Sequence, residues 1–161
     1  MVWAGMHNDQ QTELIVMRRN IASRNQGYTS DSYTDALNMG LLPMYTEDLL
    51  FQQDNAPVHT AKKSIAFLKE HSIQMLTDWP PYSPDLNPIK HLWAMLKKLV
   101  FELYPGIDRW TRGDNFVHKR IEDALVYAWS QIDPQKVQNC AASMVNRIKA
   151  CIANEGWYTK Y

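Results

Sequence analysis

A stretch with four prolines, residues 79–88, is the feature that most limits how this chain can fold. Proline fixes φ and removes a backbone donor, so the stretch enters neither a helix interior nor a central strand. The strands that we predict all lie before it: Met1–Met6, Glu13–Arg18, Leu49–Phe51 and Ile73–Thr77. Apolar residues at helical spacing follow it, over 89–103, 121–132 and 137–152. The pattern predicts an α/β protein with a helical C-terminal part.

Capping residues and turn formers predict where several elements begin. The first two strands form a hairpin, and residues 104–118 form a loop. Three helix starts are predicted: Asp31 or Ser32 before Tyr33–Leu42, Thr60 before Ala61–His71, and Asp133-Pro134 before the last helix. The last helix has a predicted apolar face of Val137, Ala141, Met144, Val145, Ile148 and Ile152.

Size and composition indicate one ordinary globular domain. The 161 residues are enough for a real core, and 17 basic against 17 acidic side chains give a net charge of zero. Residues 1–53 carry three Arg and six Asp or Glu, so 54–161 hold the other fourteen basic and eleven acidic residues. This weak asymmetry favours the second part as the one that faces an anion.

Two cysteines, Cys140 and Cys151, have neither metal-ligand spacing nor the pattern of a disulfide framework. No apolar run approaches the length of a membrane span, and no leader resembling a signal peptide is seen. We therefore expect an intracellular protein with no membrane partner.

Asp54 follows the predicted strand Leu49–Phe51 and precedes a turn broken by proline. A carboxylate at a strand end, facing an acid from a later helix, is how α/β enzymes hold divalent metals for phosphoryl chemistry. A strand-ending Asp-Asn-Ala-Pro turn is an equally good account of this position.

Two neighbouring polar residues have simpler structural explanations. His59 could orient a ligand or contact a phosphate, but a histidine before a helix start more often satisfies backbone groups there. Asp85 looks like part of an Asx-type turn into the next helix rather than a metal ligand.

Lys90, Lys97 and Lys98 extend along the polar side of the helix over 89–103. Such lysines usually form a solvent-exposed helix face. The alternative interpretation is that this face contacts phosphates.

Several segments carry a family resemblance when they are read in order. They are Met1-Val-Trp-Ala-Gly5, Gln53-Asp54-Asn55-Ala56-Pro57 with His59, Trp79-Pro80, Ser83-Pro84-Asp85-Leu86-Asn87-Pro88-Ile89 with Leu92-Trp93, and Gly156-Trp157-Tyr158. Together they resemble the C-terminal catalytic domain of mariner-type (Tc/mariner superfamily) transposases, within the DDE transposase and integrase group. The resemblance covers nearly the whole chain.

The resemblance implies a ribonuclease H-like fold, with a mixed five-stranded sheet flanked by helices. It also implies two Mg²⁺ or Mn²⁺ ions held by a triad of two Asp and a Glu or Asp, and DNA as substrate. Enzymes of this family hydrolyse DNA at transposon ends and join the freed 3′ hydroxyl to a target. Asp54 matches the second acid of that triad, and a nuclear location and a possible homo-oligomer follow from the family.

Two departures from the family pattern lower the expected activity. The family's first acid lies on a central strand upstream of Met1-Val-Trp, and neither Asp9 nor Glu13 matches it. The helix-turn-helix region that recognises transposon ends is also expected to be missing, so residues 1–161 read as a partial catalytic domain. The third acid follows Asn-Pro-Ile directly, where this chain has Lys90, with 35 residues between it and Asp54. An ammonium there would repel a divalent cation.

The sequence therefore supports three hypotheses. The first is a truncated transposase domain without activity. The second is a module that binds nucleic acid or protein on the same scaffold, and the third is a fragment of a live enzyme.

Overall fold

The computed structural model describes residues 1–24, 26–80, 83–110 and 115–161 of the chain. These residues fall into two units, each built from two separate stretches of sequence. The first unit contains Met1–Ala4 and Ile15–Tyr82, and the second contains Gly5–Leu14 and Ser83–Tyr161. No helix in the described ranges is both long enough and apolar enough to cross a membrane.

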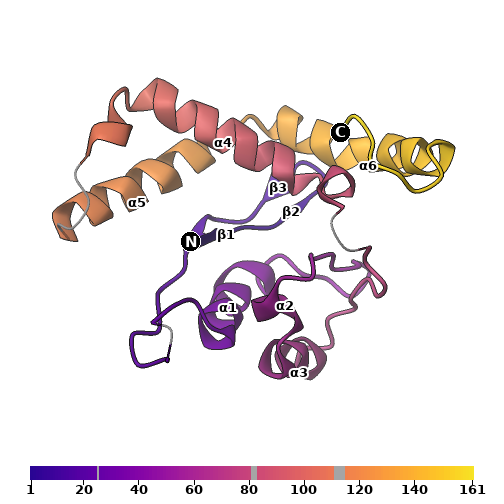
Figure 1. Ribbon diagram of the computed structural model, residues 1–161, viewed down its shortest axis with the longest axis horizontal. Coiled ribbons are helices and arrows are strands. Elements are labelled where there is room, and N and C mark those ends of the chain that lie inside the picture. Colours follow the sequence, from indigo (N-terminus) through magenta and orange to yellow (C-terminus); the bar gives the residue numbers. More distant parts are fainter. Residues whose placement is uncertain (25, 81–82, 111–114) are drawn as a thin grey trace. The chain divides into compact units, whose positions relative to one another are not determined.

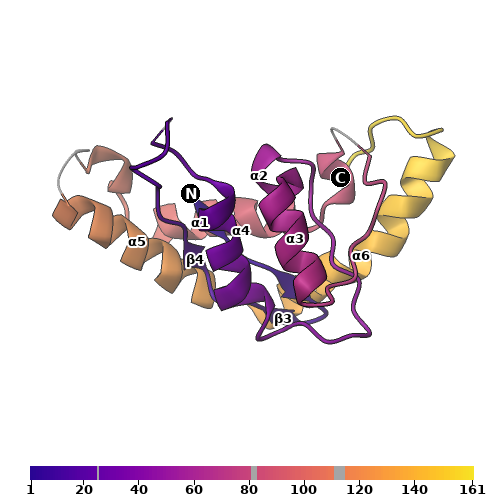
Figure 2. The same ribbon diagram turned by 90° about the horizontal axis from the view of Figure 1, so that it is seen from below.

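The first unit combines one strand pair with short helices (Figures 1 and 2). Strand β1, Val2–Trp3, pairs antiparallel with β4, Ile15–Val16. The other elements are α1 at Ser30–Ala36, a π-helical turn at Leu37–Leu41, α2 at Pro57–Thr60 and α3 at Lys62–Glu70. Helices α1 and α3 pack side by side.

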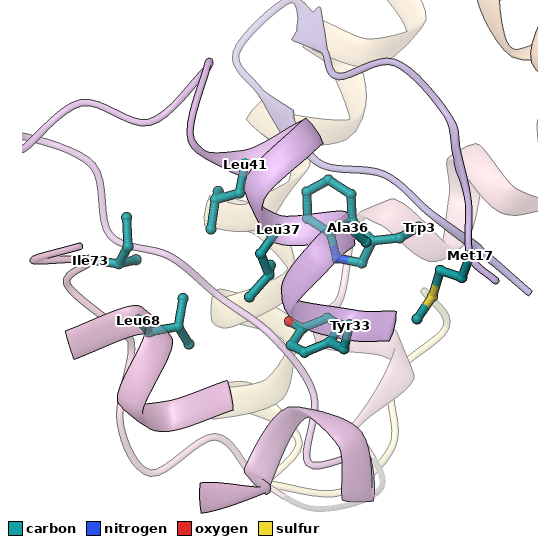
Figure 3. Close-up of a cluster of buried hydrophobic side chains, with 8 residues drawn as sticks. All are labelled: Trp3, Met17, Tyr33, Ala36, Leu37, Leu41, Leu68 and Ile73. Atoms are coloured by element: carbon teal, nitrogen blue, oxygen red, sulfur yellow. The ribbon is translucent and has the colours of Figure 1, made fainter. Parts of the chain in front are cut away.

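The core of the first unit forms around α1 and the π-helical turn. Figure 3 shows its buried side chains: Trp3, Met17, Tyr33, Ala36, Leu37, Leu41, Leu68 and Ile73. The spacing of Tyr33, Leu37 and Leu41 places them on one helical face, and β1, α3 and the segment after α3 cover that face. Burial of this face is what stabilises a helix too short to persist alone.

Gly40 allows the ring of Trp3 to approach the helix backbone closely. A Cβ added at Gly40 would lie 2.3 Å from Cζ3 of Trp3, far inside van der Waals contact. The missing side chain is therefore a packing requirement, since a tryptophan ring occupies the space that it would fill.

The chain segment before Asp54 makes a minimal parallel bridge. Phe51 pairs with Met75: the Phe51 amide donates to Gln74 O at 2.7 Å, and the Leu76 amide donates to Phe51 O at 2.8 Å. The predicted strands at Leu49–Phe51 and Ile73–Thr77 are therefore too long. The two segments do lie side by side, but they pair at a single bridge. Loops rich in polar residues border both segments, so the ladder does not extend.

The second unit is mainly helical (Figure 1). It contains β2 at Met6–His7, β3 at Gln10–Gln11, short 3₁₀ turns at Pro84–Leu86 and Ile107–Arg109, α4 at Ile89–Leu103, α5 at Asn115–Ser130 and α6 at Pro134–Ala153. Strands β2 and β3 pair antiparallel and pack against α6, and α4 packs against both α5 and α6. The helical C-terminal part is confirmed.

Trp129 of α5 is buried in the second unit and contacts both α4 and the β2–β3 hairpin segment. Its indole ring stacks on Trp93 with centroids 5.1 Å apart, and its Nε1 donates to Thr12 O at 2.7 Å. Gln11 Nε2 in turn donates to Trp129 O at 2.8 Å. Because a buried indole N–H needs an acceptor, these bonds fix the hairpin against the helix.

Helix boundaries agree with the predictions in part. The helix over 89–103 and the start of the last helix are confirmed, with the Asp133 carboxylate accepting from the Gln135 amide at 2.8 Å. Thr29, rather than Asp31 or Ser32, caps α1, and Ala61 precedes α3 where Thr60 was predicted as the cap. The predicted loop over 104–118 is wrong from Asn115 onward, where α5 begins; residues 111–114 lie outside the described residues.

The predicted apolar face of the last helix is wrong in its second half. Val137 is buried as expected, but Val145, Ile148 and Ile152 are exposed. Arg147 occupies the interior position instead. Periodicity assigns an arginine to the solvent side, and specific acceptors around this side chain override that assignment.

Candidate functional site

Asp54 lies just beyond the Phe51 bridge, at the start of the turn that leads into α2. Its Oδ1 accepts from the Ala56 amide at 3.2 Å, which is the local turn expected of an aspartate here. The same oxygen lies 2.8 Å from His59 Nδ1. The Asp54 side chain is 38% exposed, so it remains accessible from solvent.

His59 binds Asp54 twice through one ring nitrogen. Nδ1 lies 2.8 Å from the Asp54 carboxylate and 3.0 Å from the Asp54 carbonyl oxygen. Both oxygens only accept, so this nitrogen carries the proton and donates to them. The prediction that His59 satisfies backbone groups near the helix start is confirmed by its bond to the Asp54 carbonyl oxygen, and the same nitrogen also holds the Asp54 carboxylate.

Tyr33 and Gln53 both contact His59. The Tyr33 ring packs on the imidazole with centroids 4.4 Å apart, and its hydroxyl donates to Gln53 Oε1. Gln53 Nε2 donates to His59 O at 3.4 Å, so Tyr33, Gln53 and His59 each contact the other two. Burial raises the pKa of the Tyr33 phenol well above its ordinary value, and the nearby Asp54 charge adds to the increase. The phenol is therefore a neutral donor.

The helix that follows Asp54 is held by its own polar contacts. Pro57 at the first position of α2 has no amide to satisfy, and the buried Ser64 hydroxyl donates to Val58 O at 2.6 Å. Asn55 Nδ2 donates to Trp79 O at 3.0 Å. These bonds connect the Asp54 turn to the segment around Trp79, and α2 to α3.

Lys90 lies in the first turn of α4, in the second unit. Its side chain is exposed, and its amide donates to Asn87 O at 3.2 Å. Lys97 and Lys98 are exposed further along α4, and Lys98 lies 3.6 Å from Glu102. Lys90 and Lys97 are seven residues apart and so share one helical face.

The remaining acidic candidates have other positions. Asp9 is exposed at the tip of the β2–β3 hairpin, and Glu13 is exposed just after β3. Asp85 is buried and accepts from Thr159, a distant partner, and its carboxylate also accepts from the local amides of Asp85 and Leu86, which supports a structural role. Among the described residues, no group of three or more His, Cys, Asp or Glu side chains is arranged to hold a metal ion.

Sequence and structure comparisons identify what this arrangement is related to. Residues 28–107 match the family described as DDE superfamily endonuclease, a range that includes Asp54, His59 and Lys90. The Tc3 transposase of Caenorhabditis elegans is 28% identical over 163 residues, covering 97% of this chain and 44% of the relative. The Tcb1 transposase of Caenorhabditis briggsae is 34% identical over 133 residues, covering 80% of this chain and 45% of the relative.

Solved structures match the fold over almost the entire chain. The catalytic domain of Mos1 mariner transposase superposes with a TM-score of 0.64 at 21% identity, covering 99% of this chain and 82% of that structure. The Mos1 strand transfer complex gives a TM-score of 0.60 at 23% identity, covering 86% of this chain and 38% of that structure.

The fold is therefore the ribonuclease H-like fold of DDE-type catalytic domains. The chain belongs to the Tc/mariner transposase family, within the DDE superfamily of endonucleases. It spans less than half the length of the curated relatives that it matches.

Sequence reasoning found Asp54 but missed the residues that hold it. Tyr33 lies 20 residues before Gln53, and no local pattern links them. A phenol, an amide and an imidazole close to one carboxylate become visible only when the fold brings α1 to the Asp54 turn.

Proposed function

We propose that this chain is a transposase-type domain that contacts DNA and does not by itself cleave it. The observation that carries the proposal is Lys90, a cation in the first turn of α4 where the family resemblance places the third acid. The relatives' names describe transposases, and metal-dependent cleavage followed by strand transfer is the family activity that this chain would have lost.

The donor set of the described residues does not suit a pair of divalent ions. Two-metal sites rely on several carboxylates that bridge and orient both ions. Asp54 supplies one carboxylate, and its Oδ1 already accepts from His59 and from the Ala56 amide. Mos1 transposase has been solved with Mn and with Mg, which describes that protein; for this chain we derive no metal-dependent step.

A nicking assay tests the absence of cleavage. Purified protein is incubated with supercoiled plasmid and Mn²⁺, and the open-circular product is compared with a metal-free sample. We expect no nicking above background, for the native chain and equally for Lys90→Glu, because Asp54 is the one residue of this sequence matched to the three acids.

The control for this assay is Asp54→Asn. Nicking by the native chain that disappears in Asp54→Asn would show a working site and would overturn the proposal. Nicking that persists in Asp54→Asn would indicate a contaminating nuclease, and the preparation would be repeated until that activity was gone.

DNA contact by α4 is a second, separable function. Exposed Lys90 and Lys97 share a helical face, from which both ammonium groups could bind backbone phosphates. Lys98 is the next residue of the helix and lies 3.6 Å from Glu102. DNA as partner also underlies the nuclear location that we propose, and pairing with a second copy remains a prediction from the family.

Salt-dependent binding tests the α4 face. We expect affinity for duplex DNA to fall with salt, and Lys90→Ala or Lys97→Ala each to lower the slope of log K against log salt by about 1. Lys98→Ala is the matched control on the same helix and should change the slope less. Absence of measurable binding at low salt would refute DNA contact and leave the nicking result unaffected.

A further inference from the structure

The segment that follows α6 returns to the turn that begins α4. Both the Thr159 amide and the Thr159 hydroxyl donate to Asp85 Oδ2, at 3.0 and 2.9 Å. Asp85 lies in the 3₁₀ turn Pro84–Leu86 and is only 7% exposed. One buried carboxylate oxygen therefore receives two donors from a single residue 74 positions away.

Arg147 of α6 lies under the same turn and is 1% exposed. Its Nη1 donates to Asp85 O at 2.5 Å, its Nη2 lies 2.9 Å from His91 Nδ1, and its Nε donates to Ser143 Oγ at 2.8 Å. The Tyr161 ring lies 4.8 Å from the guanidinium carbon, within cation–π range. Arg147 thus links α6, the turn, the start of α4 and the segment after α6.

The charges at this junction depend on those contacts. Burial raises the pKa of the Asp85 carboxyl, but the hydrogen bonds from Thr159, together with those from the Asp85 and Leu86 amides, outweigh burial, and the pKa lies below its ordinary value. Burial lowers the pKa of the Arg147 guanidinium, which is nevertheless held by three acceptors. A buried carboxylate and a buried guanidinium would each be costly without these partners.

We propose that Trp157–Tyr161 is a strap, bound by Asp85 and Arg147, that holds the turn before α4 and the first turn of that helix in place. The N-cap residue of this helix is Pro88, which makes no side-chain capping bond, so contacts from α6 and from the segment after it contribute to holding the helix start. The strap is a property of the second unit and stands whether or not the chain binds DNA.

Amide hydrogen exchange on the full chain tests the strap. The amides of Lys90 and His91 donate to Asn87 O and Pro88 O, at 3.2 and 3.0 Å, and report opening of the first turn of α4. Thr159→Val removes the hydroxyl donor and keeps the amide, Thr159→Pro removes both, and Thr159→Ser keeps both. Amides in the middle of α5, such as those of Ala124 and Ala128, serve as the reference within the same unit.

We expect exchange at Lys90 and His91 to be about tenfold faster in Thr159→Val, because a hydrogen bond to a charged acceptor has been lost. Thr159→Pro should increase it further, Thr159→Ser should match the native chain, and α5 should be unaffected throughout. Unchanged exchange at Lys90 and His91 in both Thr159→Val and Thr159→Pro would overturn the proposal. Equal acceleration in α5 would also overturn it, since the contact would then stabilise the whole unit instead of one turn.

Discussion

Two single residues, Gly40 and Arg147, determine how their surroundings pack. Gly40 lies under the Trp3 ring, and Arg147 lies under the turn at Asp85. Each is an exception to the usual rule for its residue type: a glycine inside a helical turn and an arginine in an interior. The Trp3 ring explains the glycine, and the three acceptors around Arg147 explain the buried arginine.

Gly40→Ala tests the first of these packings. The added methyl group would collide with a buried indole, so we expect a loss of about 1–3 kcal/mol in unfolding free energy despite the better helix propensity of alanine. Chemical denaturation measures the change. Met39→Ala, at the exposed neighbouring position, is the control and should stay within about 0.5 kcal/mol. A neutral Gly40→Ala would show that Trp3 can move away at little cost.

At the scale of elements, helix starts are held in different ways. Asp133 caps α6 with a side-chain bond, Thr29 and Ser32 form a capping box at α1, and Ala61 precedes α3 without a side-chain bond. Thr60, the residue that sequence favours as a cap, instead ends α2, with its hydroxyl 3.4 Å from Ala56 O.

Substitution of the two residues distinguishes a real cap from an apparent one. Asp133→Ala should cost about 1 kcal/mol, because the Gln135 amide loses its acceptor. Thr60→Ala should cost less than about 0.5 kcal/mol, because its hydroxyl caps no helix. Both are measured by thermal or chemical denaturation. Equal losses for the two variants would contradict this assignment.

The accuracy of the sequence predictions follows from the same physics. The helix over 89–103 was predicted correctly because its apolar stripe packs as periodicity requires, on α5 and α6. The last helix was predicted correctly at Asp133 but not at Arg147, since periodicity cannot anticipate a buried guanidinium with three acceptors. Strand lengths were overestimated because β-propensity records a pattern of side chains and not the presence of a partner.

The candidate site was predicted to a similar degree. Asp54 and Lys90 were identified from the order and spacing of motifs, and both remain the residues on which the proposed function depends. His59 has the predicted local bond to a backbone group, and it also contacts the Asp54 carboxylate, which was not predicted. Its support from Tyr33 depends on helix packing that no short window of sequence contains.

At the scale of the whole molecule, one group in the second unit couples the stability of that unit to pH. The second unit contains His91, whose Nδ1 accepts from Arg147 and must therefore be unprotonated. Burial, followed by the Arg147 charge, lowers the pKa of His91 from the ordinary 6.5. The other ionisable groups at this junction are Asp85, Tyr161, Lys160 and Cys140.

We expect the stability of the second unit to fall on mild acidification. The contribution from His91 is fully present above pH 6.5 and is lost as pH falls through its lowered folded pKa, because protonation is easier in the unfolded chain. Asp85, whose pKa is also lowered, adds a second loss below 3.8. Denaturation followed at pH 5–8 measures the first effect. His91→Gln keeps an acceptor for Arg147 without titrating, so it should flatten the profile, whereas His71→Gln in the first unit should not.

The division of each unit into two stretches of sequence also orders events during synthesis. Gly5–Leu14 leaves the ribosome before Ile15–Tyr82, yet Gln11 bonds to Trp129, which is 118 positions later. At common elongation rates that interval is roughly 6–24 seconds. The hairpin segment therefore cannot pack on α5 until the whole of Ile15–Tyr82 has emerged, and its polar groups stay hydrated during that time. The nascent chain can assemble its second unit only after the sequence of the first has been translated.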